Sequence, residues 1–291
     1  MIRIEHDRQI FRMDRNHPPC AEASSGDTVC FVVTDAFGGQ VTSPEQTLDS
    51  LDWTRVNPAT GPLYVHGAAP GDTLKVEILR IDVAEQGVMA AIPGAGLFAD
   101  AVTKPEVKIL PFRAGKAVFS PDIELPLKPM IGVIGVAPTG EGIPCGVPDS
   151  HGGNMDNARI TAGTTLYLPV FVEGALLAMG DLHAVMGDGE VMVTGVECAG
   201  EVTVRVTVQK GRALSNPQHE DEAYYYTIAS DHDLLLATKR AALDMCHLVM
   251  EKKGLSFNEA GMLISAAGHA QICQVVDPKL TARFALPKNL L

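Results

Sequence analysis

Apolar and polar residues alternate along much of the first two hundred residues, which predicts a chain built mainly of β-strands. The clearest example is 202–208, where valines occupy every second position and Thr or Arg side chains lie between them. Residues 74–83 alternate in the same way, but the pattern changes phase at Ile78 and Leu79, which predicts a bulge. Residues 129–138 contain no charge and predict a buried strand in which glycines allow close packing.

Shorter signals complete the predicted β-rich part. Strands are expected at 29–34 and 63–67, and a hairpin is expected between Glu190 and Val208. Composition predicts turns at 57–62 and at 70–72. The Gly-rich segment 93–96 lacks the strand–turn–helix context of a dinucleotide fingerprint, so we interpret it as a flexible loop.

The pattern changes near Tyr224, where helical signals begin. Ser230–Asp233 is a capping sequence for a helix that runs to Lys253 and stops at Gly254, and Ser256 with Glu259 predicts a second capped helix ending near Gly268. A strand at 270–276 closes the chain. The predicted fold class is mainly β, with a β-sandwich or barrel-like body at 1–222 and a smaller C-terminal α/β (α+β) part at 223–291 packed against it.

Charge and composition exclude several classes of protein. The net charge of −12 repels phosphate backbones and anionic lipids, so we predict no nucleic-acid partner, no membrane partner and a small neutral substrate. The first twenty residues lack the apolar core of a secretory signal, and no uncharged stretch is long enough to span a membrane. Six scattered cysteines without a C-x-x-C pair predict free thiols and a cytoplasmic location.

Residues 149–190 contain an unusual density of carboxylate, amide and imidazole side chains, which lie on both sides of the apolar run 166–177. They are Asp149, His151, Asn154, Asp156, Asp181, His183, Asp188 and Glu190. Single residues of these types are usually turn formers or helix caps. Their joint density predicts one metal or catalytic site.

The spacing of these residues predicts how they converge. Asp181 and His183 are two apart, so on a strand both side chains point the same way. The turn sequence Gly187-Asp188-Gly189 returns the chain so that Glu190 can face that pair. Two imidazoles and carboxylates without a thiolate predict a divalent metal ion, with Zn²⁺ favoured and Ca²⁺ or Mn²⁺ as alternatives.

Residues outside this stretch are weaker candidates for the pocket. Asp35 and His66 each end a predicted strand, although a surface position is the simpler interpretation, and Glu141 is a further open case. Cys145 is the only cysteine nearby, and a free cysteine is more often inert than nucleophilic. The sequence contains neither a G-x-S-x-G nucleophile elbow nor an H-E-x-x-H helix.

At these residues the chain resembles the acetamidase/formamidase family. The similarity covers nearly the whole chain, and its most specific motifs are His151-Gly-Gly-Asn-Met-Asp156, the run 166–175 and Gly180-Asp-Leu-His-Ala-Val-Met-Gly-Asp-Gly-Glu190. The resemblance implies a cytoplasmic hydrolase that cleaves the C–N bond of short aliphatic amides to ammonia and a carboxylate. It also implies a mainly β fold with metal at the carboxylate–histidine cluster. His66 departs from the pattern, because similar chains often carry Glu there.

These observations give each candidate residue a predicted role. His151, Asp156, Asp181 and His183 are predicted metal ligands, and His183 is also counted among the catalytic residues. Glu190 is the predicted general base and later acid, and Asn154 is predicted to hold the oxyanion. A non-catalytic metal- or ligand-binding β-sandwich and a hydrolase of larger or cyclic amides are the alternatives. The uncharged apolar runs are compatible with a homodimer, although core strands explain them equally well.

Overall fold

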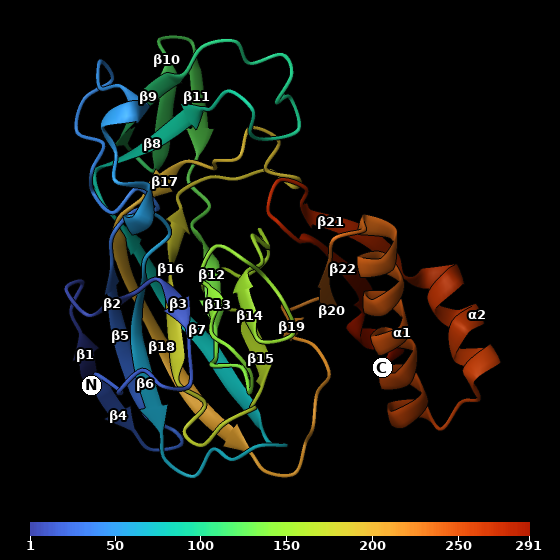
Figure 1. Cartoon of the computed structure of the whole chain (residues 1–291). Coiled ribbons are helices and arrows are strands. Elements are labelled where there is room, and N and C mark those ends of the chain that lie inside the picture. The colour runs from blue at the N-terminus through green and yellow to red at the C-terminus, as the bar shows by residue number, and fades with distance from the viewer.

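The computed structural model describes residues 1–291 and divides almost all of the strands between two large sheets (Figure 1). The first sheet has nine strands. In spatial order these are β1 (Ile2–Ile4), β5 (Thr28–Val33), β18 (Gly200–Gln209), β7 (Thr73–Val83), β15 (Thr165–Pro169), β19 (Gln218–Glu220), β20 (Tyr224–Asp231), β22 (Leu280–Pro287) and β21 (His269–Gln274).

The second sheet has eleven strands, and its strands carry Asn154, Asp181 and His183 of the residues predicted for the site. Its main path is β11 (Ile123–Pro126), β10 (Lys116–Ser120), β9 (Glu106–Arg113), β8 (Gln86–Ala91), β17 (Glu197–Cys198), β16 (Leu177–His183), β12 (Met130–Gly135) and β14 (Gly152–Asn154). β6 (Ala59–Val65) pairs with β16 and also with β2 (Gln9–Ile10) and β4 (Ala21–Ala23). A separate pair joins β3 (Arg12–Met13) to β13 (Ile143–Pro144).

A core of 32 buried apolar residues lies in the body of the molecule and includes side chains from both sheets, among them Phe31, Val76, Ile131 and Leu182. Strands β8 to β11 extend beyond this body at the top of Figure 1. The predicted mainly β fold is therefore confirmed: strands dominate, and both α-helices lie in the C-terminal part, while short 3-10 helices occur at Leu48–Ser50, Trp53–Arg55 and Lys288–Leu290.

The C-terminal part packs two helices against the end of the nine-stranded sheet. α1 (Leu234–Lys253) begins at the N-cap Asp233, whose side chain accepts from the Leu236 N–H, and ends at the left-handed Gly254. α2 (Phe257–Ala267) has the predicted capping box between Ser256 and Glu259. α1 covers β20 and β22, and α2 lies on the outer side of α1 (Figure 1).

The nine-stranded sheet crosses the predicted boundary between residues 222 and 223 without a break. β15 pairs with β19 from the body side, and β19 pairs with β20 from the C-terminal side. The helices therefore cover one end of a sheet whose other end belongs to the body.

Several strand predictions are confirmed in detail. β12 is buried along its whole length, and the ladder between β18 and β7 skips Leu79 at the predicted phase change. The strand expected at 270–276 is β21, which starts one residue earlier and ends two residues earlier. It does not close the chain as expected, because β22 follows it and pairs with it. A bulge can let a strand pass from one sheet to another, but both partners of β7, which are β15 and β18, belong to the nine-stranded sheet.

Two local predictions were wrong. The segment expected as a turn at 57–62 instead enters β6, because Ala59 and Thr60 pair with Gly180 and Met179 of β16. The expected hairpin between Glu190 and Val208 does not form. β18 is a central strand whose buried valines lie between β5 and β7, and the chain preceding it is irregular except for the short β17.

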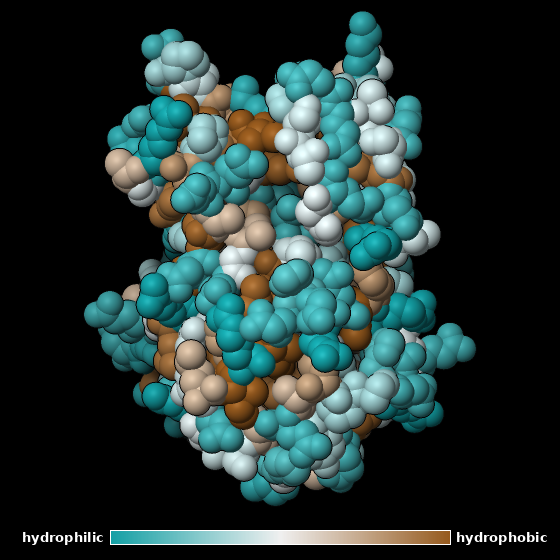
Figure 2. Space-filling view, turned by 90° about the vertical axis from the view of Figure 1, so that its left-hand side faces the viewer, coloured by the Kyte–Doolittle hydropathy of each residue, from teal (hydrophilic) through white to brown (hydrophobic).

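The surface of the molecule is mostly hydrophilic on the face shown in Figure 2, with apolar residues gathered in separate patches. Among the uncharged apolar runs that were compatible with a homodimer, the run at 129–138 contains the buried strand β12, so the protein core accounts for it. None of the helices is both long and apolar enough to cross a lipid bilayer. The homodimer stays a prediction.

Candidate active site

The imidazole of His183 is the centre of a buried acidic cluster. His183 is the last residue of β16, a strand in which every residue is buried. Asp181 comes from the same strand, and its Oδ1 lies 3.4 Å from Nε2 of His183. The two-residue spacing thus brings these side chains together as predicted.

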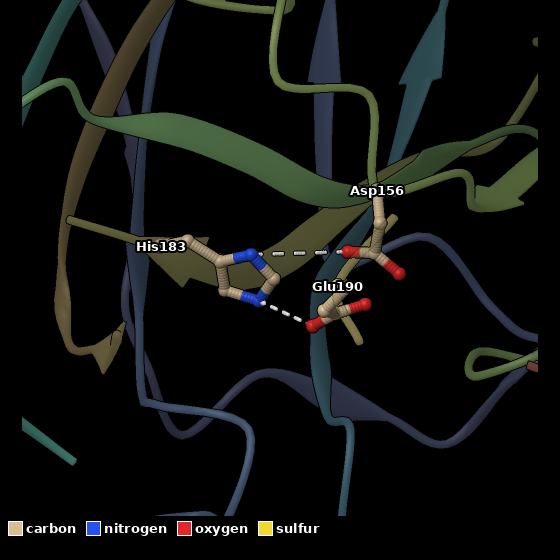
Figure 3. Close-up of side chains that lie close together, drawn as sticks. All are labelled: Asp156, His183 and Glu190. Atoms are coloured by element: carbon tan, nitrogen blue, oxygen red, sulfur yellow. Dashed lines mark ion pairs between the residues drawn. The ribbon is translucent and has the colours of Figure 1, made fainter. Parts of the chain in front are cut away.

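Two further carboxylates approach His183 from separate loops. The turn at 187–189 returns the chain so that Oε1 of Glu190 lies 3.7 Å from Nε2 of the imidazole. Asp156, in the loop after β14, places its Oδ1 3.9 Å from Nδ1. Figure 3 shows the two carboxylates facing the two ring nitrogens of His183.

Glu197 and Asp277 also belong to the site, although neither was predicted from the sequence. Glu197 starts β17 and pairs with His183 across the sheet, so that its Oε2 lies 3.0 Å from Nε2 of His183. Oδ2 of Asp277, in the turn between β21 and β22, accepts a hydrogen bond of 3.0 Å from Asn154 Nδ2. Glu197 was detectable as a charged residue inside an apolar run, whereas Asp277 had no local signal.

The backbone at three of these acidic residues is in the left-handed region. φ is 43° at Asp156, 54° at Asp181 and 48° at Glu190. Such conformations cost free energy and persist where the surroundings enforce them, commonly at functional sites. Gly132 makes room for the cluster, since a Cβ there would lie 2.5 Å from Asp156 Oδ1 and 2.6 Å from Asp181 Oδ2.

Burial and mutual repulsion hold several of the carboxyl groups away from their ordinary pKa. Burial, reinforced by Asp181, raises the pKa of Asp156 to about 7. Burial raises the pKa of Glu197 to about 8, even though His183 opposes the shift. The pKa of Glu190 rises well above its usual value because it is buried beside Asp156.

For His183 and Asp181, the attraction between opposite charges outweighs the effect of burial on the pKa. Burial lowers the pKa of His183, but Glu197 and Asp181 outweigh burial and raise it well above its ordinary value. Burial raises the pKa of Asp181, yet the neighbouring His183 lowers it on balance. One imidazolium cannot neutralise all of these carboxylates if they ionise together, and the raised pKa values of Asp156, Glu190 and Glu197 reflect that excess of acidic groups.

The donor atoms of the cluster fit a divalent cation. Buried atoms without a hydrogen-bond partner include His183 Nε2, both Oδ atoms of Asp156, Asp181 Oδ1 and Glu197 Oε2. Asp156, His183 and Glu190 form one group whose ligand atoms lie within 4.8 Å of one another, and Asp181, His183 and Glu197 form a second. Imidazole nitrogen with carboxylate oxygen is a donor set that Zn²⁺ and related ions accept.

The structure does not bring His151 into either group. Its side chain is fully buried, neither ring nitrogen has a hydrogen-bond partner, and the ring lies against Gly153. Burial lowers the pKa of His151 to about 4. The expected convergence of two imidazoles is therefore not seen, because the Gly-Gly loop directs Asp156, but not His151, to the cluster.

The weaker candidates lie outside the cluster. His66 is exposed and pairs with Glu22 at 2.8 Å, and Glu141 is exposed. Asp35 is half-buried and accepts from the Gly39 N–H. Burial raises the pKa of Cys145 to about 12, so this thiol is not a ready nucleophile. Asp149 and Asp188 pair with Lys279 and Arg283 respectively.

A cavity of about 150 Å³ opens onto the cluster. Its polar lining consists of Asn154, Asp181, Glu190, Glu197 and Asp277, together with Asn57 and Thr194, and its apolar lining includes Phe37, Trp53, Val56, Ile92 and Val193. Pockets for drug-sized ligands measure roughly 300–1,000 Å³. The cavity therefore suits a much smaller molecule, to which it offers both hydrogen-bond acceptors and apolar contacts.

Comparison with known proteins shows similarity along the whole chain. The model of the Acetamidase/Formamidase family matches residues 3–144 and 139–291. An acetamidase structure from Bacillus halodurans is 49% identical, with 99% of this chain and 98% of that chain covered and a TM-score of 0.97. The structure of a predicted acetamidase/formamidase from Thermoanaerobacter tengcongensis is 48% identical, with 100% and 96% covered and a TM-score of 0.98.

Curated relatives are more distant. A protein of Schizosaccharomyces pombe described as a putative formamidase is 27% identical over 68% of this chain, and this chain spans 64% of its length. The formamidase of Methylophilus methylotrophus is 25% identical over 98% of this chain and 90% of that protein.

Proposed function

Because this chain belongs to the Acetamidase/Formamidase family, we propose that it is a metal-dependent hydrolase of the C–N bond in short aliphatic amides, releasing ammonia and a carboxylate. The observation that carries the proposal is the convergence, beside a small cavity, of buried nitrogen and oxygen atoms that have no hydrogen-bond partner and could bind a metal ion. A neutral amide suits the site, because its N–H groups can donate to carboxylates and it carries no charge for them to repel.

We infer that the ion is held by His183 with Asp156 and Asp181, which belong to the two groups of ligand atoms that share this imidazole. Glu197, in the group with Asp181, is an additional candidate ligand in place of His151. Amide hydrolysis is slow partly because neutral water is a weak nucleophile. A bound divalent ion would lower the pKa of water from 15.7 towards about 7 and polarise the amide carbonyl. Zn²⁺ is favoured by the mixed imidazole and carboxylate donors, and Ca²⁺ or Mn²⁺ are the alternatives.

Glu190 is the proposed general base. It lines the cavity and lies beside His183, and burial with neighbouring negative charge raises its pKa well above that of an ordinary carboxyl. Such a carboxylate can take a proton from the attacking water and return it to the departing nitrogen, so that the amine leaves as ammonia.

Asn154 is the proposed oxyanion donor. Its side chain lines the cavity, and its Nδ2 already donates to Asp277, which orients the amide group. The second N–H of Nδ2 is available to a carbonyl oxygen that gains negative charge. The apolar lining, including Phe37 and Val193, would receive the acyl group of a short aliphatic amide.

The test is ammonia release from formamide, acetamide and propionamide, measured before and after chelation and again after adding back one metal at a time. We expect hydrolysis of at least one amide, loss on chelation and recovery with one of the ions. Full turnover by demonstrably metal-free protein would contradict the metal dependence. Metal binding without turnover of any linear amide would favour the non-catalytic binding protein, and turnover confined to cyclic or larger amides would favour that hydrolase.

A further inference from the structure

Arg283 is a fully buried cation in β22 that reaches towards the active site from the C-terminal part. Its side chain has no exposed surface. Nε donates to Gln271 Oε1 at 2.7 Å, Nη1 donates to Asn157 Oδ1 at 3.0 Å, and Nη2 donates to Asp188 Oδ2 at 2.5 Å. Gln271 is its neighbour on β21, so one arm of the guanidinium stays within its own sheet.

The other two arms bind the two loops that supply the site. Asn157 directly follows Asp156, and Asp188 precedes Glu190 by two residues. The backbone ties the second loop to the same strands, because the Gly189 N–H donates to the Cys273 carbonyl at 2.8 Å and the Val275 N–H donates to the Gly189 carbonyl at 3.2 Å. Arg283 therefore connects the carboxylates on the two sides of His183 in Figure 3.

We propose that Arg283 is a positioning residue that keeps Asp156 and Glu190 in place against His183. Both acidic residues have left-handed backbone conformations, with φ of 43° and 48°, which revert unless the surroundings hold them. The planar guanidinium bonds both loops in a fixed geometry, which a lysine ammonium cannot reproduce. Arg283 does not line the cavity, so it acts through the loops and not on the substrate.

This inference rests on the proposed function for its effect on turnover, but its effect on the loops can be measured separately. Arg283→Lys keeps the positive charge but replaces the planar guanidinium, which bonds both loops, with a single ammonium group. We expect faster amide hydrogen exchange in 154–158 and 187–191, and a 10–100-fold loss in zinc affinity and in kcat, the size found for residues that support metal ligands. KM should change less than kcat, because the cavity lining is intact.

A second variant guards against failure of Arg283→Lys to fold. Asp188→Asn removes the negative charge that Nη2 of Arg283 contacts. The side chain is 44% exposed, so the fold should tolerate the change, and we expect the same direction of change at roughly 2–5-fold. The matched control is Asp231→Asn, which removes the charge from an Asp–Arg pair of 2.7 Å with Arg240 in the same part of the chain, a pair that makes no hydrogen bond or ion pair with either loop. It should leave hydrogen exchange, zinc affinity and kcat at parental values.

The outcomes separate the two proposals. If the parent releases no ammonia from any amide, the proposed function fails, while hydrogen exchange and zinc affinity still decide whether Arg283 positions the loops. Parental exchange in both loops of Arg283→Lys and Asp188→Asn would overturn the positioning role. Suppose instead that the parent is active and that both variants show faster exchange in the loops. Unchanged zinc affinity and kcat in those variants would then also overturn the positioning role.

Discussion

His183 and His219 are both fully buried on strands, yet they have opposite surroundings. His183 lies within 4 Å of carboxylates from four positions, and their charge raises its pKa well above the ordinary value despite burial. His219, on β19, has no hydrogen-bond partner at either ring nitrogen and stacks near Tyr226 at 5.2 Å between centroids. Burial lowers its pKa to about 3.

The difference shows that burial alone does not make a histidine a site. An isolated buried imidazole stays neutral and behaves as part of the core. Converging carboxylates instead favour the protonated imidazole and form a cluster of the kind found at functional sites. The comparison predicts that equivalent substitutions in the two regions have different consequences.

The largest effect is expected from His183→Leu set against His219→Leu. The first substitution removes the central ligand, so bound metal and amidase activity should both be lost. The second replaces unpaired nitrogens with apolar surface and should leave metal content and kcat near parental values. Metal content by elemental analysis and ammonia release are measured on both purified variants. Loss of metal from His219→Leu as complete as that from His183→Leu would contradict the prediction.

A smaller loss is expected from Glu190→Gln, which keeps the shape of the proposed base and removes its ability to take a proton. We expect kcat to fall by roughly 10²–10⁴ with the metal retained, the usual size of general acid–base catalysis. Single-turnover kinetics with parallel metal analysis measure this. An unchanged kcat would assign proton transfer to another residue, with Glu197 and Asp277 as the nearest alternatives.

Gly132→Ala should have an intermediate effect on the acidic cluster. The added Cβ would lie within 2.6 Å of oxygens from Asp156 and Asp181, so the carboxylates must move apart. We expect roughly a 10–100-fold loss in metal affinity, as for other changes that misplace ligands. Gly140→Ala is a suitable control, because a Cβ there meets nothing within 4 Å. Equal affinities for the two variants would show that the cluster tolerates the displacement.

The smallest effect on activity, and a measurable one on stability, is expected from the titration of His219. Its pKa is about 3 when folded and about 6.5 when unfolded, so the unfolded state binds more protons between these values. Stability from the neutral imidazole is thus fully present above pH 6.5 and falls as pH drops towards 3. Between pH 7 and pH 5 the loss should be roughly 2 kcal/mol.

Urea denaturation of the parent and of His219→Leu at both pH values isolates this contribution. His151, which also has a lowered pKa, adds a slope of the same sign in both proteins, so the difference between them belongs to His219. Identical pH dependence in the two proteins would show that His219 is protonated without cost, contrary to its buried and unpaired environment.

Local spacing in the sequence was enough to predict part of the site. Asp181 and His183 follow from strand alternation, and Glu190 follows from the turn at 187–189. The ring of His151 could not be placed, because a loop with two glycines does not determine where its side chains point. Asp277 lies more than eighty residues from the motif and enters the site only through the packing of β21 and β22.

The fold shows the same limit. Helix caps at Asp233 and Ser256 were readable because they are local. The strand at Ala59 and Thr60 could not be predicted in this way. It depends on pairing with β16, more than a hundred residues away, and this pairing overrides the turn-like composition. The central place of β18 likewise depends on two distant neighbours.

The continuity of the nine-stranded sheet limits how this protein can be dissected or recombined. A gene truncated after residue 222 would encode a body that lacks both Asp277 and Arg283 and leaves β19 with an open edge, ready to associate with other chains. The strands beneath the helices thus belong both to the sheet of the body and, through Asp277, to the surroundings of Asn154, so the helical end is not a detachable module.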